Sequence, residues 1–131
     1  MGTNYYAIPS LEKVVETTES GEVTLKFNNI EEMYCFLEHY KNNIHIGKRS
    51  GGWKFLFQDQ PGCFSTYEEF VKWLNINVKT NKYTIKNEYE EEVPMEQMLD
   101  IINMAQQETN INDFTGCDNR NGYRFLKGDF S

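Results

Sequence analysis

Apolar residues alternate with polar ones in several short stretches of the chain. In residues 22–27, Val23, Leu25 and Phe27 occupy every second position, which is the pattern of a strand with one buried face. Residues 53–57 repeat the pattern with aromatic side chains, and residues 5–8, 83–86 and 123–126 are further short β-type runs. These stretches predict the strands of a small sheet. We expect the polar segment 109–121 to form a loop.

Three other segments carry apolar residues at the three-to-four spacing of an amphipathic helix. The first follows Asn28 and Asn29, and its stripe is Ile30, Met33, Tyr34, Leu37 and Tyr40. The second follows a capping box placed at Ser65 and Glu68, and its stripe is Tyr67, Phe70, Val71 and Leu74. The third begins near Pro94, and its stripe is Met95, Met98, Leu99 and Ile102. We expect each stripe to face the core.

These elements predict one α+β domain spanning residues 1–131. Strands and helices mix along the chain without an internal repeat, and 131 residues suit one hydrophobic core. The expected architecture is a small, mostly antiparallel sheet of four to six strands with about three helices packed on it. The aromatic set Tyr5, Tyr6, Trp53, Phe55, Phe57, Tyr123 and Phe125 could stack bases on a sheet face. Core packing explains most of this set more simply, because many members alternate as buried strand residues do.

The charge balance argues against a protein that grips nucleic acid directly. Thirteen Lys and Arg residues face 20 Asp and Glu residues, a net charge of −7. Binding to phosphate backbones depends on clustered cations. The charges are also segregated along the chain: residues 41–86 have a net charge of +5, whereas residues 87–119 carry nine acids and no base.

The acidic segment suggests a candidate partner-binding face. Its members are Glu88, Glu90, Glu91, Glu92, Glu96 and Asp100. A plain interpretation is a solvated surface around a helix N-terminus. A sharper one is a surface whose spaced carboxylates imitate DNA phosphates and occupy a basic groove on a partner. A metal site is not indicated, because the segment lacks the glycine turn that converges ligands in calcium loops.

Cysteine usage predicts reduced thiols and a cytoplasmic protein without cofactor or metal. Cys35, Cys63 and Cys117 are far apart, no CxxC occurs, and there are only two His residues. Neither an apolar run of membrane-spanning length nor a signal-peptide pattern is present, so no membrane association is expected. No catalytic constellation stands out either. The sequence does not show a carboxylate placed to orient His45 as a base, and nothing near Cys63 in the sequence would depress its pKa. A binding protein is therefore favoured over an enzyme.

The stretch from residue 45 to 53 is the richest in chemistry. It contains His45, Lys48, Arg49, Ser50, Gly51, Gly52 and Trp53. Glycine backbone amides can approach an anion closely, and the cations would add charge. The P-loop spacing is not met, because Lys48 precedes the second glycine of the pattern. Two interpretations stay open: a glycine-rich turn with solvated charges, or an anion or nucleotide site.

Three motifs resemble those of a family of small phage and prophage proteins. They are the opening MGTNYY, the central HIGKRSGGWKF, and GYRF followed by a terminal FS. The chain departs from the family pattern in having only Cys35 where relatives carry a Cys-x-x-Cys element, and in having Arg49 at a position of small residues. The resemblance implies a setting in an infected or lysogenic host cell. It also implies that Asn4, Tyr5, Tyr6 and Tyr123 share one surface with the central motif.

Two functions follow from these observations. The first is a small acidic phage-type accessory protein that binds and inhibits a host protein, such as a nucleic-acid-binding or antiviral defence factor, through residues 87–119 or its bipolar surface. The second is a protein that binds or processes a small nucleotide, or acts as a sponge for it, through the loop from His45 to Trp53.

Overall fold

The computed structural model describes residues 2–10, 15–39, 43–108 and 117–128. A six-stranded sheet has the order β6-β1-β4-β5-β8-β7. Its strands are β1 (Gly2–Pro9), β4 (Ile44–Ser50), β5 (Leu56–Gln58), β6 (Tyr83–Asn87), β7 (Cys117–Arg120) and β8 (Tyr123–Leu126). Every neighbouring pair is antiparallel except β5 and β8, which are parallel. The predicted α+β class with a mostly antiparallel sheet is confirmed.

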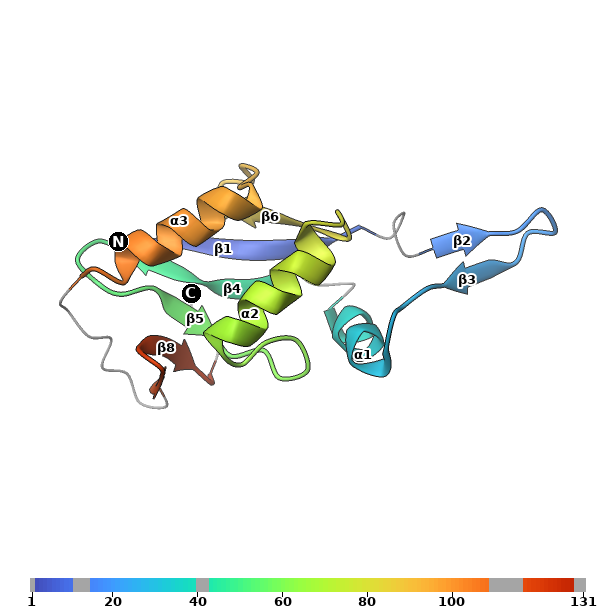
Figure 1. The fold of residues 1–131 in the computed structure, drawn as a ribbon. Coiled ribbons are helices and arrows are strands. Elements are labelled where there is room, and N and C mark those ends of the chain that lie inside the picture. The colour runs from blue at the N-terminus through green and yellow to red at the C-terminus, as the bar shows by residue number, and fades with distance from the viewer. Residues whose placement is uncertain (1, 11–14, 40–42, 109–116, 129–131) are drawn as a thin grey trace.

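Three helices and a second, smaller sheet complete the described structure. The helices are α1 (Ile30–His39), α2 (Tyr67–Trp73), which continues into the π-helical turn η2 (Leu74–Val78), and α3 (Met95–Ala105). Helices α2 and α3 cover the same face of the six-stranded sheet (Figure 1). Among the described residues, strands β2 (Val15–Thr17) and β3 (Val23–Leu25) pair only with each other, and they project from the body as an arm with α1 near its base (Figure 1).

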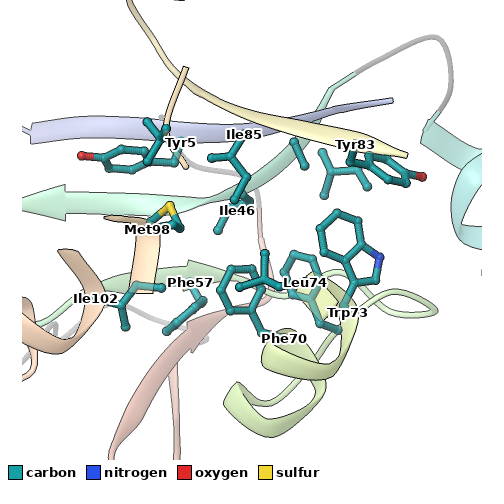
Figure 2. Packing of buried hydrophobic residues seen from close by; sticks show 14 of the residues in the cluster. Tyr5, Ile46, Phe57, Phe70, Trp73, Leu74, Tyr83, Ile85, Met98 and Ile102 are labelled. Atoms are coloured by element: carbon teal, nitrogen blue, oxygen red, sulfur yellow. The ribbon is translucent and has the colours of Figure 1, made fainter. Parts of the chain in front are cut away.

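Aromatic packing holds the helices to the sheet. Phe57 of β5 stacks on Phe125 of β8 with ring centroids 4.7 Å apart, and it meets the edge of Phe70 from α2 at 5.4 Å. Figure 2 shows Met98 and Ile102 of α3 reaching toward the same space. All five side chains are fully buried. The expectation that the aromatic residues serve the core is thus confirmed for Phe57 and Phe125.

The predictions for residues 53–57 and 109–121 are wrong in part. The expected strand at 53–57 starts only at Leu56, because residues 50–53 close a turn in which the Trp53 N–H donates to the Ser50 carbonyl at 3.1 Å. The expected loop at 109–121 contains strand β7, while 109–116 lie outside the described residues. Asn121 and Gly122 both have positive φ, 55° and 88°. An Asn-Gly pair in this conformation is a tight hairpin turn, and it folds β7 back onto β8.

The capping box of α2 is shifted by one residue from its predicted place. Thr66, not Ser65, is the N-cap, and its Oγ1 accepts a hydrogen bond from the Glu69 N–H at 3.1 Å. The Glu69 carboxylate accepts from the Ser65 N–H at 2.9 Å. Ser65 is not the cap because its hydroxyl bonds to Asp59 at 2.5 Å instead.

The prediction that the apolar stripe of the first helix faces the core is wrong. Ile30 and Tyr34 are each 62% exposed and Leu37 is 42% exposed, whereas Cys35 and Phe36 are buried. Tyr40 lies outside the described residues. The alternating strand at 23–27 is likewise shorter and more exposed than expected, since β3 ends at Leu25 and all three of its residues face water. The sheet of the arm has no third strand among the described residues.

Candidate functional site

The hairpin end of β4 places the cation Arg49 against its own backbone. The Arg49 guanidinium donates to the Ser50 carbonyl at 2.7 Å and to the Trp53 carbonyl at 2.9 Å. It also lies 3.6 Å from the Glu108 carboxylate just beyond α3. Gly52 adopts a φ of 82°, which favours glycine and closes the turn. Arg49 therefore stabilises the hairpin and does not point toward a shared anion site with Lys48.

Lys48 and Ser50 converge on the other side of the strand, above Gly2. A Cβ atom at Gly2 would lie 2.5 Å from the Ser50 Oγ and 2.8 Å from the Lys48 Cε. Only glycine leaves room there for both side chains. Because side chains alternate along a strand, Arg49 points away from this pair. The structure thus divides the predicted loop residues into two groups.

The opening and central motifs are neighbours in the sheet. Strand β1 runs antiparallel to β4, pairing Gly2 with Ser50, Asn4 with Lys48 and Tyr6 with His45. The His45 Nε2 lies 2.9 Å from the Asn4 Oδ1, and the Asn4 side chain is almost fully buried. The Tyr6 ring stacks on the His45 ring with centroids 5.1 Å apart. Asn4, Tyr6 and His45 therefore form a polar and aromatic patch on the face opposite the helices.

The expectation of a single motif surface is wrong for Tyr5 and Tyr123. Tyr5 alternates with Asn4 and Tyr6, so its ring faces the core, 6.2 Å from Phe55. Burial raises the pKa of its hydroxyl. Tyr123 of β8 stacks on Tyr67 of α2 at 4.0 Å, also on the helix-covered face. The motif segments adjoin in the sheet, but the period-2 alternation of strands sends their side chains to opposite faces.

The six predicted acidic residues are all exposed. They follow the β6–α3 connection and the outward side of α3, and they are Glu88, Glu90, Glu91, Glu92, Glu96 and Asp100. The Asn87 side chain orders the connection, because its Oδ1 accepts from the N–H groups of Tyr89 and Glu91 at 2.9 and 3.0 Å. Within the described residues, no ion pair includes any of these six carboxylates.

Several other carboxylates of the chain form ion pairs with cations. Glu32 pairs with Lys82, and Asp59 pairs with Arg120. The acidic face differs also in displaying two apolar side chains, since Tyr89 and Met104 are each 68% exposed. It therefore combines uncompensated negative charge with apolar contact area. Both properties suit recognition of a basic protein surface.

A cleft of about 540 Å³ lies between α1, the loop before α2, and α2 with η2, and sequence reasoning missed it. Residues from three separate segments line it, among them Glu31, Cys35, Cys63, Lys72, Trp73 and Asn77. Its lining includes part of η2, and π-helical turns are often found at functional sites. No motif marks this cleft, because its walls come together only in the folded chain.

The wall of the cleft contains a disulfide that corrects the expectation of reduced thiols. Cys35 of α1 is bonded to Cys63, with Cα atoms 5.3 Å apart. The two residues are 28 positions apart in the sequence, so their spacing carried no signal of the contact. The bond attaches α1 covalently to the loop before α2.

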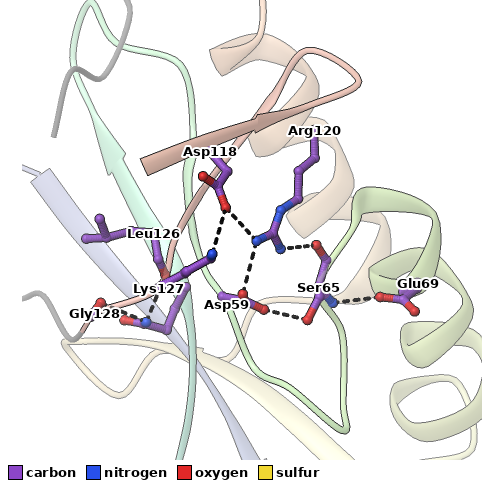
Figure 3. Close-up of polar contacts among 9 residues, drawn as sticks. Asp59, Ser65, Glu69, Asp118, Arg120, Leu126, Lys127 and Gly128 are labelled. Carbon is purple, nitrogen blue, oxygen red and sulfur yellow. Dashed lines mark hydrogen bonds and ion pairs between the residues drawn. The ribbon is translucent and has the colours of Figure 1, made fainter. Parts of the chain in front are cut away.

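A polar network holds that loop to the edge of the sheet (Figure 3). The Arg120 guanidinium donates to the Ser65 carbonyl at 2.5 Å and to the carboxylates of Asp59 at 3.2 Å and Asp118 at 2.8 Å. Arg120 lowers the pKa of Asp118 below its usual range. Lys127 approaches Asp118 at 3.6 Å. The network fixes the segment 59–65, which carries Cys63.

The described part of the chain contains no group of three or more His, Cys, Asp or Glu side chains placed to hold a metal ion. None of its helices is both long and apolar enough to span a membrane. Comparisons of the chain with family models, curated proteins and solved structures return no match. The resemblance to phage proteins therefore stays a prediction.

Proposed function

We propose that this protein is a small acidic accessory protein that binds and inhibits a basic partner protein. In the setting that the phage resemblance implies, the partner is a host protein that binds nucleic acid or acts in antiviral defence. The observation that supports this proposal is the acidic face: six exposed carboxylates that form no ion pair with the described residues.

The physical argument rests on charge that is held in place. Glu96 and Asp100 are four residues apart on α3 and so lie on one side of it, and the β6–α3 connection is ordered by the Asn87 side chain. A fixed array of like charges attracts a partner of opposite sign and speeds association at low salt. A basic groove that normally holds phosphates offers such a partner surface. Occupying the groove would exclude nucleic acid.

The test compares one triple and one double charge variant. In Glu90→Gln/Glu91→Gln/Glu92→Gln the acidic face loses three charges, and in Glu19→Gln/Glu22→Gln the exposed arm loses two. Tagged proteins are recovered from host-like cells under gentle conditions and weighed by native mass spectrometry. We expect the wild type and the arm variant to retain a stoichiometric basic protein, and the acidic-face variant to lose it at least tenfold.

Competition with short duplex DNA then tests the mechanism on the recovered partner. If the acidic face occupies a nucleic-acid groove, DNA and this protein displace each other. Simultaneous binding of both would contradict the groove mechanism. Equal recovery of the partner by the wild type and both variants would contradict the role of the acidic face in binding.

A second function has one specific observation in its favour, the convergence of Lys48 and Ser50 above Gly2. A lysine and a serine side chain that approach the same point suit a phosphate group, so binding of a small nucleotide is the alternative proposal. A co-purifying mass of several hundred daltons, lost in Lys48→Ala, would support it. Arg49→Ala is the matched control, because Arg49 contacts only its own hairpin and Glu108 in the contacts described above.

A further inference from the structure

Helix α1 presents its apolar stripe to solvent. Ile30, Tyr34 and Leu37 are spaced by four and three residues, so they lie on one side of the helix, and all three are substantially exposed. At 100° per residue, Cys35 and Phe36 lie on the opposite side. An amphipathic helix ordinarily packs its apolar stripe inward. In α1 the orientation is reversed.

Three contacts on the inner side of α1 hold this orientation. Cys35 is bonded covalently to Cys63. The Phe36 ring meets the edge of Tyr83 at 6.3 Å and lies 5.4 Å from Phe27. The Glu32 carboxylate forms an ion pair with Lys82 in which the Glu32 side chain is only 7% exposed. The helix cannot rotate to hide its stripe without breaking these contacts.

The charges beside the stripe indicate the chemistry of what covers it. Glu31 and Glu38 are seven residues apart, so both lie along the same flank of the stripe, and both are exposed. No ion pair among the described residues includes either one. A second copy of the chain docked stripe to stripe, with its α1 antiparallel, would bring the four carboxylates of the two flanks together. Like charges at such short separations repel, so a partner with cationic side chains fits better.

We infer that α1 is a docking helix whose Ile30, Tyr34 and Leu37 enter an apolar groove, rimmed by Lys or Arg, on another protein. Recognition of this type uses anchors at i, i+4 and i+7 of one helix. The inference does not rest on the proposed function, because α1 lies near the arm and away from α3 and the acidic face (Figure 1).

The test uses two designed helical-hairpin peptides with the same leucine-lined groove. One has lysines along its rim and the other has glutamates at the same positions. Fluorescence anisotropy measures their affinity for the intact protein. We expect the lysine-rimmed peptide to bind at least tenfold more tightly. We expect Ile30→Ser/Leu37→Ser to abolish this binding, and Glu31→Gln/Glu38→Gln to remove most of the preference for lysine.

Two controls keep the outcome specific to α1. Met104→Ser removes an equally exposed apolar side chain from α3 and should change nothing. Glu90→Gln/Glu91→Gln/Glu92→Gln should also bind the peptide normally, which separates this inference from the proposed function. The unfolding midpoint of Ile30→Ser/Leu37→Ser should match the wild type, because both side chains are exposed.

Three results would overturn the inference. The first is equal affinity for the two peptides, and the second is no affinity for either. The third is a wild-type dimer in sedimentation equilibrium that Ile30→Ser/Leu37→Ser converts to monomer, since a second copy would then be the occupant.

Discussion

The six-stranded sheet with α2 and α3 buries most of its apolar side chains, whereas α1 and the β2–β3 arm expose several of theirs. Phe57 and Phe125 alternate with polar or smaller residues and are fully buried. Val23 and Leu25 alternate in the same way, yet they are 67% and 43% exposed. The same contrast separates Met98 and Ile102 of α3 from Ile30 and Tyr34 of α1.

This difference teaches that a period identifies an element but does not decide what its apolar face contacts. Strand β5 has neighbours on both sides and helices above it, so its alternation becomes burial. Strand β3 has one neighbour, β2, and a two-stranded sheet offers no layer to pack against. In α1, a disulfide and an ion pair on the other side of the helix determine the orientation.

The difference in stability between the six-stranded sheet and the arm should be largest when apolar side chains are truncated. Phe57→Ala removes the ring that packs between Phe125 and Phe70, and we expect a loss of about 3–5 kcal/mol in the free energy of unfolding. Val23→Ala should stay within about 0.5 kcal/mol, because its side chain is mostly exposed. Urea unfolding at neutral pH measures both. Comparable losses would show that the arm is packed in solution.

Reduction of the Cys35–Cys63 bond should act mainly on the α1 end. The two cysteines are 28 residues apart in the sequence. In the chain-entropy model, a disulfide that closes a loop of this length stabilises a protein by about 3–4 kcal/mol. We therefore expect a reductant to lower the wild-type unfolding midpoint and to leave Cys63→Ser unaffected. Amide exchange should accelerate in α1 and remain slow in β1 and β4. Three reactive thiols in the denatured, non-reduced protein would contradict the bond.

Arg120→Ala should destabilise the body moderately, through the segment 59–65. It leaves the Asp59 carboxylate, whose side chain is only 9% exposed, without its cation. Loss of a partner for a mostly buried polar group costs about 1–3 kcal/mol. Lys127→Ala is the matched control, because that side chain is 65% exposed, and its loss should cost less than about 0.5 kcal/mol. Equal effects of the two variants would argue against the network in Figure 3.

The smallest effect should be a pH dependence confined to α1. Burial lowers the pKa of His39 at the end of α1, so folding favours its neutral form. The resulting stability is present above the ordinary imidazole value of about 6.5 and is lost as the pH falls through the lower folded value. The protection factor of the α1 amides, which corrects for the slower intrinsic exchange at lower pH, should therefore fall as the pH is lowered from about 7.5 to about 5.5, and should fall less in His39→Gln. An identical pH response in His39→Gln would assign the effect to another group.

Local patterns predicted much of the fold and little of the site. Strands β1, β6 and β8 and all three helices lie where periodicity and turn residues placed them. The hairpin turn at Asn121 and Gly122 carried a readable signal that the polar composition of its segment obscured. The cleft carried none, since Cys35 and Cys63 meet only after α1 packs beside the loop before α2.

The chain's own residues determined the α+β class, the places of the helices and the acidity of residues 87–119, because these depend on near neighbours and on composition. Tertiary structure decided that the acidic side chains of Glu88 to Glu92 lie exposed and form no ion pair among the described residues, and that Arg49 and Lys48 point to opposite sides. It also decided that the apolar stripe of α1 faces solvent. These outcomes depend on contacts between segments far apart in sequence, which no local period records.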